Sequence, residues 1–273
     1  MHDRLWLFLA TLGYLASAGW GLYALGSQRP IANRWTFLLI ALGFVFHTLF
    51  LRERGEVIQH CPITNLFETL AFFSWSLVLT YLVIGPAYHM SILGAFTAPI
   101  VFLMNFFALA APIDVPSAMP HLGWQLELHA TLALLGLGIL GVAAMAGLAY
   151  LIQDRQLKRR ALTSWFYTLP NVGRLEEVQQ RVLIWGFVIF SAGAVLGFFI
   201  PHQTSEDWVK IAWSAVVWAL YAALVLVLWM GKLSHKKTAW LSVCGYVFIL
   251  LTFWGIDSLS EAHVFPHEVT LNP

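Results

Sequence analysis

The chain has 273 residues, of which 59% are hydrophobic and only 11% are charged, and its mean hydropathy is +0.74. A soluble domain of this length would carry about 25% charged residues, so the composition excludes an ordinary soluble protein and predicts an integral membrane protein. The net charge of +1 excludes the basic footprint that nucleic-acid binding requires, so we expect no nucleic-acid partner. Backbone amides in lipid must be bonded within the protein, and apolar runs of about 20 residues without strict alternation favour helices over a barrel.

The sequence predicts an all-α, polytopic membrane protein with eight transmembrane helices in one domain over residues 1–273. The first apolar run follows directly on His2, Asp3 and Arg4 and is expected to be a retained span, not a cleaved signal peptide. One long connection, residues 153–181, includes the segment RLEEVQQR, which could form a short surface helix. The predicted spans are residues 5–25, 35–51, 65–84, 91–111, 125–152, 182–200, 209–230 and 238–257.

A polar turn separates the second and third predicted spans. Charged residues at 52–56 end the incoming segment, and Pro62 prevents a continuous helix. Thr64 or Asn65 can cap the next helix, with Glu68 following at the spacing of a capping box. We expect this turn to lie at a membrane surface.

Lysine and arginine are segregated between alternate connections, eleven on one side and four on the other. The positive-inside rule then places both termini outside. The smaller, external group is Arg4, Arg52, Arg54 and Lys210, and the larger, internal group is Arg29, Arg34, Arg155, Lys158, Arg159, Arg160, Arg174, Arg181, Lys232, Lys236 and Lys237.

Most histidines fall on the external side in this orientation. Neutral imidazole is a strong ligand for haem iron, zinc and copper. His129 begins the glycine-rich fifth span, and His263 follows the eighth span on the same side. Either the two hold one haem iron from opposite sides, or each is an interfacial polar residue at a helix end. His47 and His60 could place two further imidazoles on that side.

Two further features are open to two readings each. Trp208, Trp213 and Trp218 recur every five residues, which spreads them over several helix faces. They could anchor the helix in the membrane interface or form an aromatic shelf for a porphyrin. His47 lies inside a span, where an ionisable residue usually faces the bundle interior, either as a ligand or relay or in an interhelical hydrogen bond.

Conventional enzyme chemistry finds little support. The sequence has no nucleophile–base arrangement, phosphate-binding glycine loop or CxxC pair, which predicts no conventional catalytic site. Two unpaired thiols are favoured over a disulfide for Cys61 and Cys244. A transporter is a third reading, because Pro99 and Asn105 interrupt the fourth span.

Several segments together resemble the cytochrome c assembly protein family, the haem-handling membrane proteins of the CcsA and HemX type. The resemblance covers about residues 35–265. GFVFHTLFL followed by HCPITNLFETLAFFSW is similar to the family's His-x-Pro-x-x-Asn-x-x-Glu-Ser signature. WQLELHATLALLGLGI is similar to the segment with the first external haem histidine, RVLIWGFVIFSAGAVLGFF to the span before the tryptophan-rich loop, and LTFWGIDSLSEAHVF to the stretch with the second histidine.

The resemblance implies that His129 and His263 ligate haem iron at the external face, beside a shelf formed by the Trp208–Trp218 region. It implies a bacterial-type inner (plasma) membrane protein of cytochrome c biogenesis that handles b-type haem, bound at least in transit. The implied partners are a membrane protein of cytochrome c maturation and apocytochrome c. At most, the chain would be one part of a haem-attachment machinery.

The chain also departs from this pattern. EDWVKIAWSAVVWALY keeps tryptophans but lacks the Trp-Asp-Pro-Lys core, and Leu226 stands where the family has an intramembrane histidine. These differences leave an alternative, a HemX-like regulatory or scaffolding membrane protein linked to tetrapyrrole synthesis without haem transfer. If the family geometry is preserved, Leu226→His is expected to increase haem retention.

Overall fold

The computed structural model describes residues 2–26, 34–59, 61–63, 65–88, 93–110, 123–159, 169–200 and 207–261. These residues form eight α-helices and no strand, which confirms the prediction of an all-α chain. The helices are α1 (His2–Gly26), α2 (Arg34–Ile58), α3 (Leu66–Ala87), α4 (Gly94–Ala110), α5 (Trp124–Arg159), α7 (Val172–Gly197), α8 (Asp207–Trp229) and α9 (His235–Glu261).

The helices have the length and composition of membrane spans. Within the described ranges, seven are long and apolar enough to cross a bilayer, and α4 is a shorter apolar helix of 17 residues that contains Pro99. In α1, Leu5, Phe8 and Leu12 are exposed at the spacing of one helix face, while Leu7 and Tyr14 are fully buried on another. A helix that is apolar on its inner and outer faces is typical of a membrane environment.

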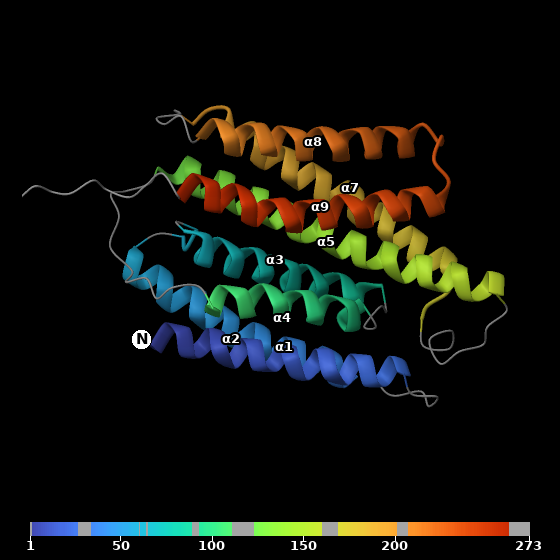
Figure 1. The fold of residues 1–273 in the computed structure, drawn as a ribbon, viewed down its shortest axis with the longest axis horizontal. Coiled ribbons are helices and arrows are strands. Elements are labelled where there is room, and N and C mark those ends of the chain that lie inside the picture. Colours follow the sequence, from blue (N-terminus) through green and yellow to red (C-terminus); the bar gives the residue numbers. More distant parts are fainter. Residues whose placement is uncertain are drawn as a thin grey trace, which may run out of the picture.

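The helices lie side by side, and α3 occupies the middle of the bundle (Figure 1). On one side of it lie α1, α2 and α4, and on the other lie α5, α7, α8 and α9. One end of the bundle, at the left in Figure 1, holds the N-termini of α1, α3, α5 and α8 and the C-termini of α2 and α9. We call this end the site end.

Three helices extend well beyond the predicted spans, and one of them, α5, continues to Arg159 instead of ending near residue 152. RLEEVQQR is not a separate surface helix, because α7 runs without interruption from Val172 to Gly197. Its residues are good helix formers and include no breaker, so the span simply continues into the polar layer. Likewise, α2 continues to Ile58 through the charged residues at 52–56.

Glycines let α5 and α7 approach closely beside the site end. A Cβ built on Gly136 would lie 2.6 Å from the Cα of Phe190, and one on Gly193 would lie 2.7 Å from the backbone nitrogen of Ala133. Any larger residue would push the two backbones apart, which is the role of small residues between membrane helices. The contact therefore fixes α5 relative to α7.

Candidate functional site

A cavity of about 210 Å³ lies near the site end. Five of its lining residues are on α5, at positions 129, 130, 133, 134 and 137, which is the spacing of one helix face. Ligand pockets usually measure about 300–1,000 Å³, so this cavity can take the edge of a flat ligand but cannot enclose it. The remaining lining residues come from the turn before α3 and from four other helices: Ile63, Thr69, Phe190, Trp213, Ser214 and Phe253.

His129 is half-buried at the rim of this cavity and is held by α7. Its Nδ1 lies 2.7 Å from the carbonyl oxygen of Gly193. Because a carbonyl oxygen can only accept, Nδ1 carries the proton and donates the hydrogen bond. In the neutral imidazole, Nε2 then keeps its lone pair and can bind a metal. Metal-binding histidines commonly donate their other ring N–H to a carbonyl in this way.

Trp213 forms an aromatic wall of the same cavity. Its Nε1 donates a hydrogen bond of 2.8 Å to the Thr252 Oγ1 of α9, which fixes the indole. Its ring meets Phe253 edge-on, with the centroids 5.8 Å apart. Phe190 of α7 contributes a third ring to the lining. This apolar, aromatic surface next to an imidazole suits a flat conjugated ligand.

The three candidate tryptophans do not all face this cavity. Trp218 is 41% exposed, donates a hydrogen bond of 2.9 Å to the Ser191 Oγ of α7 and packs against Phe187. Trp208 belongs to the first turn of α8, but its side chain lies outside the described residues. Among the described side chains, Trp213 is the candidate tryptophan that the fold brings to His129.

The other candidate histidines have different outcomes. His47 is fully buried on α2, and its Nδ1 lies 3.2 Å from the hydroxyl of Tyr14 on α1, an interhelical hydrogen bond. It does not line the cavity. His60 and His263 lie outside the described residues.

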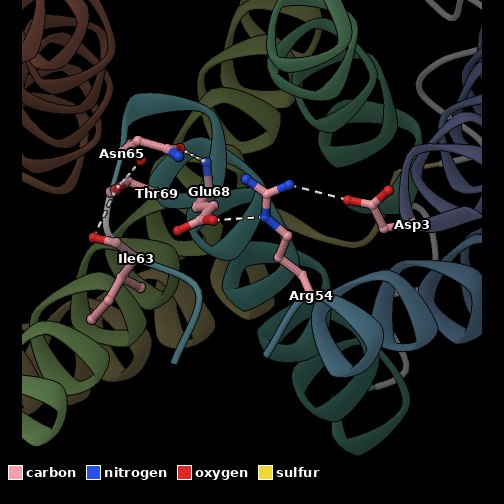
Figure 2. A network of polar contacts seen from close by, with 6 residues as sticks. All are labelled: Asp3, Arg54, Ile63, Asn65, Glu68 and Thr69. Carbon is pink, nitrogen blue, oxygen red and sulfur yellow. Dashed lines mark hydrogen bonds and ion pairs between the residues drawn. The ribbon is translucent and has the colours of Figure 1, made fainter. Parts of the chain in front are cut away.

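The turn that leads into α3 forms the cavity wall beside His129. Asn65, one of the two caps that the sequence predicted, is the N-cap of α3, and its side-chain oxygen accepts a hydrogen bond of 2.8 Å from the backbone nitrogen of Glu68. Thr69 Oγ1 donates to the carbonyl oxygens of Asn65 at 2.8 Å and Ile63 at 3.4 Å. Ile63 and Thr69 both line the cavity, so the cap and the wall are one unit (Figure 2).

Behind this turn lies a buried ion-pair network that the sequence patterns did not predict. The Arg54 guanidinium donates from Nε to Glu68 at 2.7 Å and from Nη1 to Asp3 at 3.1 Å (Figure 2). It joins α1, α2 and α3 at the site end. The sequence groups Arg54 with the charged residues at 52–56 near a membrane surface, yet in the structure it is 1% exposed.

Helix periodicity could have revealed this burial. The buried residues of α2 include Ile40, Gly43, His47, Phe50, Arg54 and Ile58, which recur every three or four positions. Arg54 therefore continues the inward-facing stripe. Arg52 does not, and it forms an exposed pair with Glu56.

Both cysteines are free thiols in the structure. Cys61 is half-buried in the turn, and its Sγ lies 3.9 Å from the Thr131 Oγ1 of α5. Burial raises the pKa of the Cys61 thiol above its ordinary value, and the charges of Glu127 and Glu68 act in the same direction. The thiol is therefore protonated at neutral pH and is a poor nucleophile.

The chain is similar over most of its length to known proteins that carry the names CcsA and HemX. The chain is 22% identical over 245 residues to the cytochrome c biogenesis protein CcsA of Guillardia theta, covering 81% of each protein. It is 24% identical over 242 residues to protein HemX of Bacillus subtilis (strain 168), covering 86% of this chain and 87% of that one. The cytochrome c biogenesis protein CcsA of Synechococcus sp. (strain CC9902) is 25% identical over 283 residues, with 92% and 91% covered.

The profile of the family described as "Cytochrome C assembly protein" matches residues 63–263, which is most of the chain. The match runs from Ile63 in the cavity wall through His129 and Trp213 to His263. The chain therefore belongs to the cytochrome c assembly protein family.

Proposed function

We propose that this protein binds haem at the site end and presents it for cytochrome c maturation, with His129 and His263 as axial ligands of the iron. The cofactor would be b-type haem, which need not stay bound. The relatives named cytochrome c biogenesis protein CcsA support the process, and the His129 arrangement supports the site.

The residues around the cavity fit a haem. The observation that carries the proposal is the hydrogen bond between His129 Nδ1 and the Gly193 carbonyl, because it leaves Nε2 as the nitrogen available to iron. Trp213, Phe190 and Phe253 offer aromatic surface to a porphyrin edge. In the described residues no three His, Cys, Asp or Glu side chains gather into a multidentate metal site, so the porphyrin itself would supply the remaining iron ligands.

The course of α9 supports His263 as the second ligand. Phe253 lines the cavity together with His129, and α9 continues from there toward the site end as far as Glu261. Eight residues of helix span about 12 Å, so α9 ends about 12 Å beyond Phe253 along its axis, on the side of the site end. His263 follows two residues later. His60, from the turn next to Cys61, and Trp208 complete the proposed haem-binding set.

Haem would supply the redox-active iron and the vinyl groups that become attached to a cytochrome. The protein's own residues would bind the macrocycle, orient its iron and shield one edge in the apolar cavity. No acid–base or nucleophilic step is assigned to them. A partner membrane protein and apocytochrome c would meet the haem at the exposed side of this site.

We propose that the site end faces outward from a bacterial-type inner membrane and that the whole chain is one membrane domain. The basic residues at the opposite end support this orientation: Lys158 and Arg159 end α5, and Lys236 and Lys237 begin α9. Reporter fusions at Gln156 and Lys236 should report the cytoplasm, and a fusion at the C-terminus should report the outside. A cytoplasmic C-terminus would overturn the count of eight spans.

An optical spectrum of the detergent-purified protein tests the haem site. Wild type should show six-coordinate low-spin haem, and His129→Ala and His263→Ala should each lose it. His235→Ala is the matched control, because His235 pairs with Glu176 at 2.6 Å at the opposite end of the bundle. Equal haem in all four proteins would overturn the assignment.

A second function is favoured by the likeness to HemX and by the altered tryptophan block. In that case the chain is a regulatory or scaffolding membrane protein linked to tetrapyrrole synthesis. The same spectra distinguish the two functions, because a scaffold that does not handle haem would purify without haem and bind none when titrated with it.

A further inference from the structure

The His129 imidazole occupies space that a side chain at position 197 would otherwise fill. A Cβ built on Gly197 would lie 2.7 Å from His129 Cε1 and 2.9 Å from Nδ1. Cβ atoms essentially never approach other heavy atoms within 3.0 Å, so a residue with a side chain at 197 requires the ring to move. The ring thus depends on a glycine in the last turn of α7.

Gly193, one helical turn earlier, holds the same ring in a different way. Its carbonyl oxygen accepts the hydrogen bond from His129 Nδ1 at 2.7 Å. A carbonyl has two lone pairs, so it can bind the imidazole without giving up its place in the helix. Residues 193 and 197 share one face of α7, so the carbonyl and the gap together form a seat for the imidazole.

The two glycines act on different parts of α5. A Cβ at 193 would meet the Ala133 backbone nitrogen at 2.7 Å and would force the helices apart, whereas a Cβ at 197 meets only the imidazole among its three nearest atoms. A methyl group at 197 therefore perturbs the ring with little effect on the helix contact.

We propose that Gly197 is a positioning residue for iron binding: the open space at 197 lets the Gly193 carbonyl hold His129 in the one orientation and tautomer that leaves Nε2 for the iron. This inference rests on the proposed haem function and adds the device that prepares the ligand. It concerns a residue at which an added Cβ would have three imidazole atoms as its nearest neighbours.

Gly197→Ala should break this arrangement. The ring has to rotate or slide away from the added methyl, which lengthens or breaks the Nδ1 hydrogen bond and frees the proton to occupy either nitrogen. Loss of such a supporting hydrogen bond typically weakens metal affinity by about 10–100-fold. Gly19→Ala is the matched control, because a Cβ at this other membrane-helix glycine meets nothing within 4 Å.

Two measurements test the proposal. The first is nitrogen NMR of haem-free protein with labelled histidine, in which the signal missing from His129→Ala identifies His129. In wild type and Gly19→Ala, the proton of the neutral ring should lie on Nδ1 of His129, and Gly197→Ala should show a mixture of tautomers. The second is haem titration followed by the optical and electron paramagnetic resonance spectra. Gly197→Ala should bind haem about 10–100-fold more weakly than wild type, whereas Gly19→Ala should bind it as tightly as wild type.

The outcomes separate this inference from the proposed function. Haem binding unchanged by His129→Ala would overturn the haem site, and the NMR arm would still decide whether the seat exists. A wild-type His129 protonated at Nε2 would overturn the seat even if the Gly197→Ala protein did not fold. If Gly197→Ala has the same His129 tautomer and the same haem affinity as wild type, Gly197 has no positioning role.

Discussion

Arg54 donates a hydrogen bond of 2.7 Å from its Nε to Glu68 Oε1, and each of the two side chains is only 1% exposed. The second hydrogen bond of Arg54, to Asp3, brings the start of α1 into the same network. Glu68 lies one residue before Thr69, which lines the cavity. The ion pairs thus hold three helices together directly behind the cavity wall.

We expect Glu68→Gln to destabilise the protein by about 3 kcal/mol, because removing one partner of a buried ion pair leaves the other charge poorly compensated. Thermal unfolding in detergent, followed by circular dichroism, measures the loss. Glu56→Gln is the control: its pair with Arg52 is 62% and 73% exposed at the two side chains, so the change should cost less than about 1 kcal/mol. Equal losses in the two variants would contradict the structural role of the network.

A second prediction compares two helix caps that make the same side-chain hydrogen bond. Asn65 caps α3 beside the cavity and Asn171 caps α7 at the opposite end, each accepting a backbone hydrogen bond of 2.8 Å. Each Asn→Ala change should cost about 1 kcal/mol of stability. Asn65→Ala alone should also weaken haem binding in a titration, because the capped turn carries Ile63 and Thr69. Equal weakening by Asn171→Ala would show that the effect is one of general stability.

Sequence patterns predicted the elements well but not the direction in which every residue faces. The apolar runs predicted the helices, and Pro62 followed by Asn65 predicted the start of α3. The inward orientation of the Arg54 side chain was not predicted, because a charged residue near a helix end is normally exposed. The ring contact with Gly197 joins α5 and α7 across 68 positions, and no local pattern encodes it.

Position 226 is a second place where the direction of the side chain decides the expectation. Leu226 is 48% exposed, whereas Val217, Tyr221 and Leu224 are the buried residues among the described side chains of α8. An imidazole at 226 would therefore point out of the bundle, and the expected gain in haem retention from Leu226→His loses its structural basis. The family resemblance matches positions along the sequence. It does not determine the rotation of α8 about its own axis, which depends on packing against α7 and α9.

The pH dependence of cysteine alkylation gives a third prediction. Because burial raises the pKa of Cys61, its thiolate fraction stays low at pH 8, and alkylation should be slower in the folded Cys244→Ala protein than after unfolding in detergent. The rate should keep rising above the ordinary thiol pKa of about 8.5, since the folded-state pKa lies higher.

Two neighbours of Cys61 should shift this profile in opposite directions. Glu127 raises the Cys61 pKa through its charge, so Glu127→Gln should move the profile to lower pH. Thr131 lowers the pKa through its hydrogen bond, so Thr131→Val should move it to higher pH. Mass spectrometry of the modified protein over a pH series measures both rates, and a common direction of shift would contradict the contacts seen here.

The last prediction concerns His47, whose position inside a span is compatible with either a ligand or a structural residue. In the structure it is fully buried, its Nδ1 lies 3.2 Å from the Tyr14 hydroxyl, and it does not line the cavity. We expect Tyr14→Phe to cost about 1–3 kcal/mol, because it leaves a buried ring nitrogen without this hydrogen bond. A double-mutant cycle with His47→Leu should give a coupling energy of about 0.5–3 kcal/mol, as contacting residues do.

Haem titration of the three variants should match wild type, since the hydrogen bond joins α1 to α2 away from the site. Loss of haem in His47→Leu as complete as in His129→Ala, with no coupling to Tyr14, would instead make His47 a ligand or relay.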